Sequence, residues 1–362
     1  HSSRMRMKKV VKEELAAMRG AQVARGEKPR YDRRWRVSVE TPPGGRPAVI
    51  RFRNPLDGAV TWDDLVKGPV TVSNDELDDL VLLRGDGVPT YNFGVVVDDL
   101  DMGMTHVIRG DDHVNNTPRQ INLYRALGAE VPHFAHVPMI LGADGQRLSK
   151  RHGAVSVLQY RDEGFLPDAL VNYLARLGWS HGDEEMFSRA QLVEWFDLEH
   201  VSRSPARWDP EKLRWLNGEY LKRIPAADLV EAIRARNPAL HAEIAAAMDP
   251  VAMTEVGQGS WSLVGEHEAF LHELASPVTT DPAIVSQYLD EKGRGVVGDL
   301  AAALEPVEWT AGGVKAALQA FVKGRGLKMP EVMMPLRVAV TRKAQTKAID
   351  AIVAALRKEV VL

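Results

Sequence analysis

The hydrophobic pattern of the sequence changes near residue 155, and this change constrains the fold more than any other feature. Before it, short runs rich in β-branched residues alternate with helical segments, as in a parallel sheet whose strands are joined by helices. After it, apolar residues recur with helical spacing and no strand pattern follows. The chain is therefore predicted to be α/β in its first part and all-α in its second part.

The parallel sheet is predicted from a strand–helix–strand pattern. Phe93–Val97 is a continuous apolar run, which indicates a strand buried on both faces, and Met104–Ile108 predicts a second strand. A helix is expected at 118–127, because Thr117 can cap it, Pro118 suits its first position and Gly128 lies just past its end. His136–Leu141 then predicts the next strand.

A smaller α+β unit is predicted for residues 12–88. A short helical pattern begins at Lys12, Val49–Arg53 alternates apolar and basic residues like a half-buried strand, and further short strands are indicated within 61–72. These strands do not alternate with helices, so we place a domain boundary near residue 88. Residues 1–11 are interpreted as a tag remnant or truncation junction and are left out of the fold prediction.

The second part of the chain predicts helices separated by proline and glycine. The clearest is Pro167–Leu177, which is amphipathic and ends before Gly178. Further helices are expected at 189–196, 210–223, 226–247, 284–304, 310–322 and 346–358.

Composition excludes several classes of protein. A length of 362 residues suggests two to three domains. The net charge is only −3, so any surface that binds nucleic acid has to be local. The sequence has no cysteine, which excludes disulfides, thiolate zinc ligands and cysteine nucleophiles. It has no apolar run near the roughly 20 residues that span a bilayer and no signal-peptide pattern, so we expect a cytoplasmic protein.

The segment Gly142–Gly153, with the sequence GADGQRLSKRHG, indicates chemistry more strongly than any other. It follows a strand at the sheet edge where parallel sheets bind ligands, and it carries Arg147, Lys150 and Arg151 against one acid, Asp144. A flexible, positively charged loop suits a reaction in which negative charge develops on phosphate oxygens. An ordinary solvated basic turn is the alternative, and the spacing alone leaves both open.

Acidic residues follow the two predicted strands. Asp98, Asp99 and Asp101 come after the first, and Asp111 and Asp112 after the second. Clustered carboxylates at strand ends can hold Mg²⁺ with a nucleotide, or they can serve as ordinary turn residues.

Arg109 ends the second predicted strand, where a guanidinium needs a partner. Internal pairing with Asp111 or Asp112 is one interpretation, and a substrate carboxylate, held by two hydrogen bonds, is the other. Tyr91 precedes the first predicted strand and could donate a hydrogen bond into the same pocket or pack there.

The region from 323 to 347 is strongly basic. It has seven basic residues and one acid, Glu331, in a chain that is acidic overall. This is an electrostatic pattern suited to a phosphate backbone, or else a solvated helical face. The basic residues are Lys323, Arg325, Lys328, Arg337, Arg342, Lys343 and Lys347.

Taken together, these segments resemble the bacterial glutamyl-tRNA synthetases, which are class I aminoacyl-tRNA synthetases. The resemblance runs from about Lys12 to Leu362, and it implies a Rossmann-like catalytic domain with an α+β insertion and a C-terminal helical anticodon-binding bundle. It is carried by GEKPRYD at 26–32, by 75–128 with its YNFGVVVDDLDMGMTHVIRGDDH, by RLSKRHGAVSV at 147–157, by LPDALVNYLARLGW at 166–179, by DPEKLRWLNGEYL at 209–221 and by LKMPEVMMPLRVAVT at 327–341.

The resemblance implies roles for the basic loop. Arg147–Arg151 corresponds to the family's KMSKS-type loop, which binds ATP and stabilises the transition state of adenylate formation. Lys150 is then the ATP-contacting lysine, with Ser149, Arg147 and Arg151 as its catalytic neighbours. Arg147 stands where the family pattern has its first lysine.

The resemblance also implies a substrate pocket and a tRNA-binding surface. Tyr91 and Arg109 correspond to residues that line the family's glutamate pocket. Asp111 and Asp112 would lie beside that pocket and the acceptor end of the tRNA. The basic stretch at 323–347 would lie in the anticodon-binding region.

The domain plan follows from the same resemblance. Residues 12–88 would be the acceptor-stem-binding insertion, 89–141 the second half of the Rossmann-like domain, 142–225 the KMSKS-type loop and stem-contact region, and 226–362 the helical anticodon-binding region. The family's HxGH-type motif does not occur in the sequence. We therefore expect the first half of the nucleotide-binding fold, roughly a hundred residues, to be missing. The full-length enzyme is predicted to be active, and a fragment without this motif could be inactive.

The implied activity is ATP-dependent activation of L-glutamate to glutamyl-adenylate and transfer to the 3′ end of tRNA-Glu by a monomer. Mg²⁺ would accompany ATP, and we expect no zinc, no metal-ligating residue and no membrane partner. Three alternatives stay open: a glutaminyl-tRNA synthetase, whose anticodon part is a β-barrel; a non-catalytic tRNA-binding module; and a Mg²⁺-dependent hydrolase built on Asp98, Asp99 and Asp101.

Overall fold

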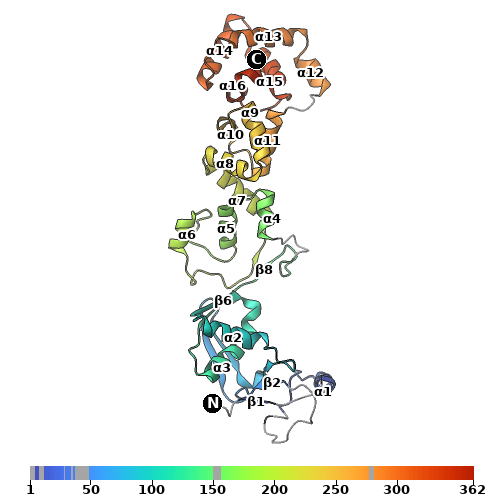
Figure 1. Ribbon diagram of the computed structural model, residues 1–362, viewed down its shortest axis with the longest axis vertical. Coiled ribbons are helices and arrows are strands. Elements are labelled where there is room, and N and C mark those ends of the chain that lie inside the picture. Colours follow the sequence, from blue (N-terminus) through green and yellow to red (C-terminus); the bar gives the residue numbers. More distant parts are fainter. Residues whose placement is uncertain are drawn as a thin grey trace. The chain divides into compact units, whose positions relative to one another are not determined.

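The structure is a computed structural model, and it describes residues 5–7, 12–27, 29–33, 36, 49–149, 156–276 and 281–362. The chain divides into two compact units. Unit 1 contains residues 1–152, 175–185 and 190–208, and unit 2 contains residues 153–174, 186–189 and 209–362. Figure 1 labels the elements along the chain.

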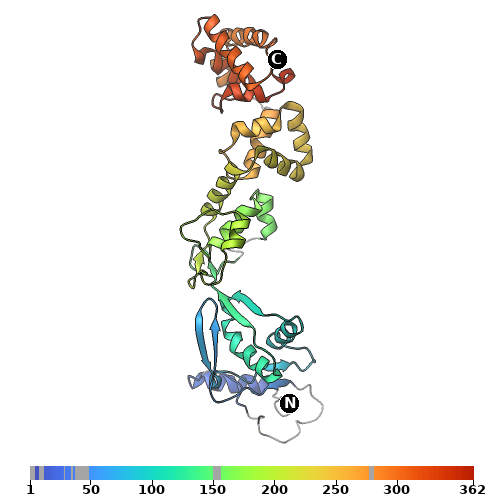
Figure 2. The same ribbon diagram turned by 90° about the vertical axis from the view of Figure 1, so that its left-hand side faces the viewer.

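A four-stranded sheet in unit 1 has the strand order β4–β3–β7–β6. β3 (Ala59–Asp64) and β4 (Gly68–Ser73) form an antiparallel hairpin, drawn in blue in Figure 2, whereas β6 (His106–Gly110) and β7 (His133–Val137) run parallel. β3 pairs in parallel with β7. The sheet thus combines strands from both sides of residue 88, where the sequence predicts a domain boundary. The assignment of 12–88 to an insertion stays a prediction.

The predicted strand Phe93–Val97 is wrong, because these residues lie in helix α2 (Tyr91–Asp101). The helix begins after Thr90, which has extended backbone. Phe93, Val96 and Leu100 share one face at helical spacing; Val96 is fully buried, and the other two pack against the same core. Packing of this face outweighs the weak helix preference of the valines, which amounts to about 0.7 kcal/mol or less per residue.

The predicted strand–helix–strand unit is confirmed for β6, helix α3 (Thr117–Leu127) and β7. Gly128 follows α3 with a φ of 72°, a left-handed conformation that glycine adopts without strain. The predicted strand His136–Leu141 is divided at Pro138, which has no N–H group for a sheet ladder. β7 therefore ends at Val137, and β8 (Ile140–Leu141) pairs instead with β9 (Ala206–Arg207).

A three-stranded antiparallel sheet, also in unit 1, has the order β1–β2–β5. Its strands are β1 (Met5–Met7), β2 (Ile50–Phe52) and β5 (Val81–Leu83), and β2 confirms the strand predicted at 49–53. Helix α1 (Lys12–Ala24) starts where predicted and continues further. Two 3₁₀ segments, η1 (Asn74–Glu76) and η2 (Asp111–Asn116), precede β5 and α3.

The described residues of unit 2 are helical apart from their connections, as predicted. Several helices begin with an Asp-Pro or Asn-Pro pair, in which the acidic or amide side chain accepts backbone N–H groups and proline occupies the first helical position; Asp209, Asn237 and Asp249 are examples. The helices are α4 (Val157–Glu163), α7 (Pro210–Arg223), α8 (Ala226–Arg236), α9 (Pro238–Ala247), α10 (Pro250–Gly257), α11 (Val264–Ala275), α12 (Pro282–Tyr288), α13 (Glu291–Leu304), α14 (Ala311–Gly324), α15 (Met329–Thr341), α16 (Ile349–Ala355) and α17 (Lys358–Val361).

Two more helices, α5 (Pro167–Arg176) and α6 (Arg189–Trp195), contain residues of both units. The predicted segments 226–247 and 284–304 each form two helices, and α10, α11 and α15 lie in segments for which the sequence pattern predicts nothing. The core of unit 2 is aliphatic, with Leu229, Met248 and Ile352 fully buried. Among the described residues, no helix combines the length and apolarity needed to cross a membrane.

Candidate active site

Arg109 lies near the end of β6 and faces His136 on the neighbouring strand β7, with which it is in register. The side chain is partly buried. Its Nε donates to His136 Nε2 at 3.2 Å, and its Nη2 donates to Thr117 Oγ1 and to Gln120 Oε1, both at 2.8 Å. All three partners are uncharged acceptors; burial lowers the pKa of His136, so its ring is neutral near pH 7. Within the described part of the chain, none of the ion pairs found involves Arg109.

The two neighbouring aspartates have other partners, so neither takes the role of internal partner to Arg109. Asp111 accepts from Lys67 Nζ at 2.9 Å. Asp112 pairs with Arg147 Nη1 at 3.0 Å. The interpretation of Arg109 as a strand-end arginine paired with one of these carboxylates is therefore wrong, because Lys67 and Arg147 pair with them instead.

The charge of Arg109 is held in a poorly hydrated place. Burial lowers the pKa of its guanidinium, while the nearby Tyr91 and Asp99 act in the opposite direction. Nε and Nη2 are occupied by His136, Thr117 and Gln120, so Nη1 is the nitrogen that a ligand would share with the Tyr91 hydroxyl. A carboxylate at Nη1 would supply a directly bonded negative charge, which the hydrogen-bond partners His136, Thr117 and Gln120 do not.

Tyr91 is the first residue of α2 rather than the residue before a strand, and 56% of its side chain is exposed. A side-chain hydrogen bond between Tyr91 and Arg109 is among the interactions that favour the charged guanidinium. The Tyr91 ring also lies 6.0 Å from the ring of His113. The fold thus brings Tyr91 and Arg109 together, as their pairing in the sequence analysis requires, and their role in binding glutamate stays a prediction.

Asp64 and His136 belong to the same cluster and were not singled out from the sequence. Both side chains are fully buried, and His136 Nδ1 is hydrogen-bonded to Asp64 Oδ2. A signal for Asp64 exists: in the alternating pattern of β3 it falls on the same buried face as Val60 and Trp62. No comparable signal distinguishes His136 from a histidine that merely packs in a strand.

The basic loop begins as a tight turn after β8. Gly142 donates to the carbonyl of Gln146 at 2.8 Å, and Gly145 has a φ of 76° at the tip. Arg147 bridges back to Leu141 and forms the ion pair with Asp112. Ser149 is the last residue described before residue 156, so Lys150 and Arg151 lie outside the described residues.

The basic stretch at 323–347 is divided by α15. Lys323, Arg325 and Lys328 lie before it, and Arg342, Lys343 and Lys347 lie after it; a helix of this length separates its ends by about 20 Å. Arg325 is paired with Asp299 at 2.7 Å and Lys343 with Glu273 at 2.6 Å. Arg337 lies within the helix, partly buried, and donates to Thr346 at 3.1 Å.

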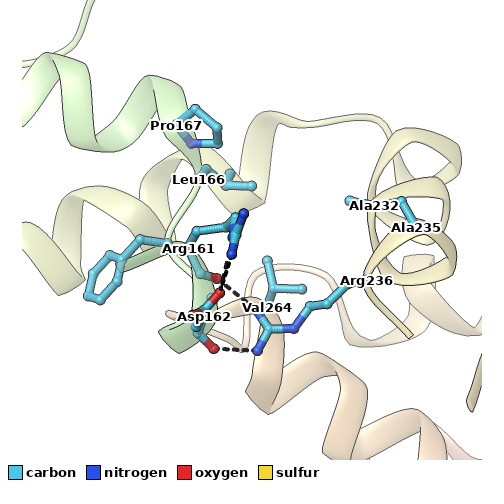
Figure 3. A pocket seen from close by; sticks show the side chains of 10 residues that line it. Arg161, Asp162, Leu166, Pro167, Ala232, Ala235, Arg236 and Val264 are labelled. Atoms are coloured by element: carbon cyan, nitrogen blue, oxygen red, sulfur yellow. Dashed lines mark hydrogen bonds and ion pairs between the residues drawn. The ribbon is translucent and has the colours of Figure 1, made fainter. Parts of the chain in front are cut away.

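Two cavities in unit 2 differ in what they offer a ligand. One, of about 450 Å³, is lined by Lys343, Lys347, Glu273 and Phe270, next to the second half of the basic stretch. The other, of about 560 Å³, is shown in Figure 3. There Arg236 donates to the backbone carbonyls of Arg161 and Asp162, and Arg161 pairs with the carboxylate of Asp162. Both arginines that line this cavity are therefore already engaged in contacts within the protein.

The acidic residues after the first predicted strand lie in the last turns of α2. Asp99 accepts a hydrogen bond from the hydroxyl of Tyr124 at 3.2 Å. Across the described ranges, no three or more His, Cys, Asp or Glu side chains are grouped so that they could hold a metal ion. The hydrolase alternative built on Asp98, Asp99 and Asp101 therefore has no supporting geometry.

Two family models match the chain. One is the class I tRNA synthetase catalytic domain of the E and Q types, at residues 7–215, and the other is an anticodon binding domain, at residues 262–362. The described part of the second range consists of helices and their connections and contains no named strand, which argues against the β-barrel of the glutaminyl alternative. The fold class predicted from the sequence, α/β followed by all-α, is confirmed.

Curated relatives and a solved structure agree with these matches. The chain is 56% identical to a glutamate–tRNA ligase of Nitrosospira multiformis, over 96% of this chain and 75% of the relative. It is 52% identical to a glutamate–tRNA ligase of Bordetella avium, over 97% and 76%. A crystal structure of a glutamate tRNA ligase from Elizabethkingia meningosepticum, in complex with its amino acid, superposes with a TM-score of 0.79 at 27% identity, over 99% of this chain and 77% of that one. The chain therefore belongs to the glutamate–tRNA ligase family of class I aminoacyl-tRNA synthetases, as the resemblance predicts.

Proposed function

We propose that this chain serves the ATP-dependent joining of L-glutamate to tRNA-Glu, through a glutamyl-adenylate. Within the family just identified, one observation carries the assignment of the substrate: Arg109 is a partly buried cation whose hydrogen-bond partners at Nε and Nη2 are uncharged, and it lies beside the hydroxyl of Tyr91. Such a site selects an acidic ligand, because a neutral ligand would leave the guanidinium without a counter-charge.

The reaction needs little covalent chemistry from the protein. A carboxylate oxygen of glutamate attacks the α-phosphate of ATP, the bond to the leaving pyrophosphate breaks, and a terminal ribose hydroxyl of tRNA later displaces AMP. Positioning and stabilisation of phosphate charge are the main catalytic needs. We assign the second to the loop that contains Arg147, Ser149, Lys150 and Arg151, with Lys150 as the ATP-contacting lysine.

Mg²⁺ would reach the site with ATP and neutralise phosphate charge there. The donor set of the described residues does not include a ready metal site, so we assign no residue of this chain to the ion. We place the reaction in the cytoplasm, where tRNA and ATP are both present.

Binding of tRNA is assigned to the exposed lysines and arginines at both ends of α15. Lys323, Lys328, Arg342 and Lys347 are exposed, whereas Arg325 and Lys343 already share their charge with carboxylates. We expect the first group to contribute more to phosphate binding, since its members form no ion pair with the described residues. Asp111 and Asp112, each held by a basic partner, would border the glutamate pocket.

The assignment is tested on the full-length enzyme, which is also the parent of every variant below, by amino-acid-dependent exchange of pyrophosphate into ATP, measured with tRNA present. Glutamate should support exchange, and the isosteric amide glutamine should not, because it brings no charge to Arg109. L-Aspartate serves as an acidic control of shorter length. Exchange with glutamine at the rate found for glutamate would contradict the proposal. Specific tRNA binding with no exchange for any amino acid would favour the non-catalytic tRNA-binding alternative instead.

A further inference from the structure

We propose that Asp64 and His136 are positioning residues that orient the guanidinium of Arg109 toward the substrate carboxylate. The inference rests on the proposed function, because it takes Arg109 as the group that binds the substrate. Neither residue needs to touch the substrate. The juxtaposition that carries the proposal is a continuous chain of hydrogen bonds from Asp64 through His136 to Arg109.

Asp64 is a fully charged acceptor at the end of β3. Its Oδ1 accepts the backbone N–H groups of Val66, Lys67 and His136, at 3.1, 3.0 and 3.0 Å. Its Oδ2 meets the ring nitrogen Nδ1 of His136 and the indole N–H of Trp62, the latter at 3.4 Å. Burial acts to raise the pKa of Asp64, but these hydrogen bonds outweigh it and lower the pKa. Asp64 is therefore ionised and can only accept.

An ionised Asp64 fixes the tautomer of His136. Because the carboxylate has no proton to give, the proton of the bond must sit on His136 Nδ1. Burial lowers the pKa of His136, against the opposing effect of Asp64, so the ring is neutral near pH 7 and Nε2 carries a lone pair. That lone pair points to Arg109 Nε at 3.2 Å and to Thr117 Oγ1 at 3.1 Å.

The lone pair on His136 Nε2 is what holds Arg109 in place. With Nε bonded to His136 and Nη2 bonded to Thr117 and Gln120, two edges of the planar guanidinium are fixed. Gln120 is itself oriented by Asn92 of α2, at 3.0 Å. Nη1 is then the nitrogen that a ligand and the Tyr91 hydroxyl would share. If Nε2 carried the proton instead, two N–H groups would oppose each other and Arg109 would have to move.

The substitution Asp64→Asn tests whether the orientation of Arg109 depends on Asp64 through His136, with almost no change in side-chain volume. Three backbone N–H groups surround Oδ1, so the amide oxygen of Asp64→Asn should stay there and its NH₂ should replace Oδ2. His136 Nδ1 would then face a donor and lose its proton to Nε2. We expect ¹⁵N NMR of the histidine side chains to show this change of protonated nitrogen, with the His136 signal assigned by its loss in His136→Gln.

The same variant should impair glutamate binding selectively. We expect the KM for glutamate to rise at least about tenfold, as for loss of a well-placed charged hydrogen bond, and the KM for ATP to change less than about twofold. Asp79→Asn is the matched control, because Asp79 is 2% exposed, pairs with Arg36 and lies outside this chain of bonds. It should lower thermal stability and leave the KM for glutamate unchanged.

Two substitutions of His136 keep the test decisive if Asp64→Asn does not fold. His136→Leu removes the acceptor for Arg109, whereas His136→Gln can place an amide oxygen where Nε2 stood. Glutamate KM should rise in the leucine variant and return to within a few-fold of the parent in the glutamine variant. Equal KM values in the two variants, an unchanged tautomer in Asp64→Asn, or an equal rise of KM in Asp79→Asn would each overturn the inference.

The inference and the proposed function fail in different ways. If Arg109→Ala raises the KM for glutamate but neither Asp64→Asn nor His136→Leu does, the positioning role is wrong and the proposed function stands. If glutamate supports no exchange in the parent protein, or if Arg109→Ala leaves its KM unchanged, the proposed function is wrong. The NMR result reports on the Asp64–His136 pair in either case.

Discussion

Arg109 and His136 occupy matching positions on the parallel strands β6 and β7, and their side chains meet at 3.2 Å, Nε to Nε2. Neighbouring residues in a parallel pair point to the same face, so the strand register itself creates this contact. A shift of one residue would turn Arg109 to the opposite face of the sheet, away from Thr117 and Gln120. The substrate-facing cation is thus specified by sheet pairing.

Replacement of Arg109 should affect glutamate far more than ATP. Arg109→Ala removes the cation opposite the substrate carboxylate, and we expect the KM for glutamate to rise by about 30-fold or more, with a much smaller change for ATP. Steady-state pyrophosphate exchange at varied glutamate and ATP measures both. Arg119→Ala, a surface arginine on α3 that bonds the carbonyl of Asn115, is the control and should match the parent. Equal effects on both substrates would argue against the carboxylate role.

Lys150 should matter for the chemical step. Lys150→Ala removes the proposed ammonium partner of the ATP phosphates, so the single-turnover rate of adenylate formation should fall by about 100-fold or more, with glutamate affinity retained. Rapid-quench measurement of adenylate gives this rate directly. Gln146→Ala changes an exposed side chain in the same turn and should leave the rate intact. A normal rate in Lys150→Ala would refute the assignment.

The exposed basic residues around α15 should bind phosphate. We expect Lys323→Ala and Lys347→Ala each to weaken tRNA binding and to reduce the slope of log affinity against log salt by about one. Filter binding between 50 and 200 mM salt, about the range where such effects are large, is the measurement. Lys292→Ala, whose lysine pairs with Glu331 at 2.9 Å, is the control. Slopes that are unchanged in both test variants would exclude these contacts.

His267 should make unit 2 sensitive to acid. Burial lowers its pKa from 6.5 to about 4, and its Nδ1 has no hydrogen-bond partner among the described residues, while Nε2 meets Thr254 Oγ1 at 3.0 Å. The unfolded chain therefore binds a proton between pH 6.5 and 4 that the folded chain excludes. The free energy of unfolding should have its full value above pH 6.5 and should fall by about 3 kcal/mol as the pH drops to 4.

Urea unfolding monitored by the fluorescence of Trp261, which stacks on His267 at 4.0 Å between ring centroids, measures this dependence. In His267→Gln the side chain does not titrate, so the curve of unfolding free energy against pH should be flatter over the same window. The two curves would coincide if His267 were not the titrating group.

The sequence pattern identifies β6, α3 and β7 because each carries a local signal. The two strands have apolar runs of strand length, and α3 has a Thr-Pro pair at its start and a glycine after its end. The pattern fails at α2, where a run of valines fits a buried strand and a helix equally well. The outcome was decided by tertiary contacts of Phe93, Val96 and Leu100, which a window of five residues does not contain.

The candidate site likewise contains some residues that the sequence predicts and others that it does not. Arg109 and Tyr91 stand out by charge, position and resemblance. The partners of Arg109 do not, because Thr117, Gln120 and His136 are ordinary residues whose importance comes from pairing across strands and packing of α3. The interpretation of Asp111 and Asp112 as partners of Arg109 fails for a related reason, since Lys67 and Arg147 are distant in sequence.

Pro138 has a consequence for motion. It separates β7, which carries His136, from β8, which leads into the loop of Arg147, and β8 belongs to a different two-stranded sheet. Among the described residues, the strands that position Arg109 and the loop proposed to act on ATP therefore share no ladder of backbone hydrogen bonds. Pro138 and Met139 join them along the chain, and the ion pair between Arg147 and Asp112 joins them through side chains. A change of backbone conformation at 142–149 would therefore leave in place the register of β6 and β7 that positions Arg109.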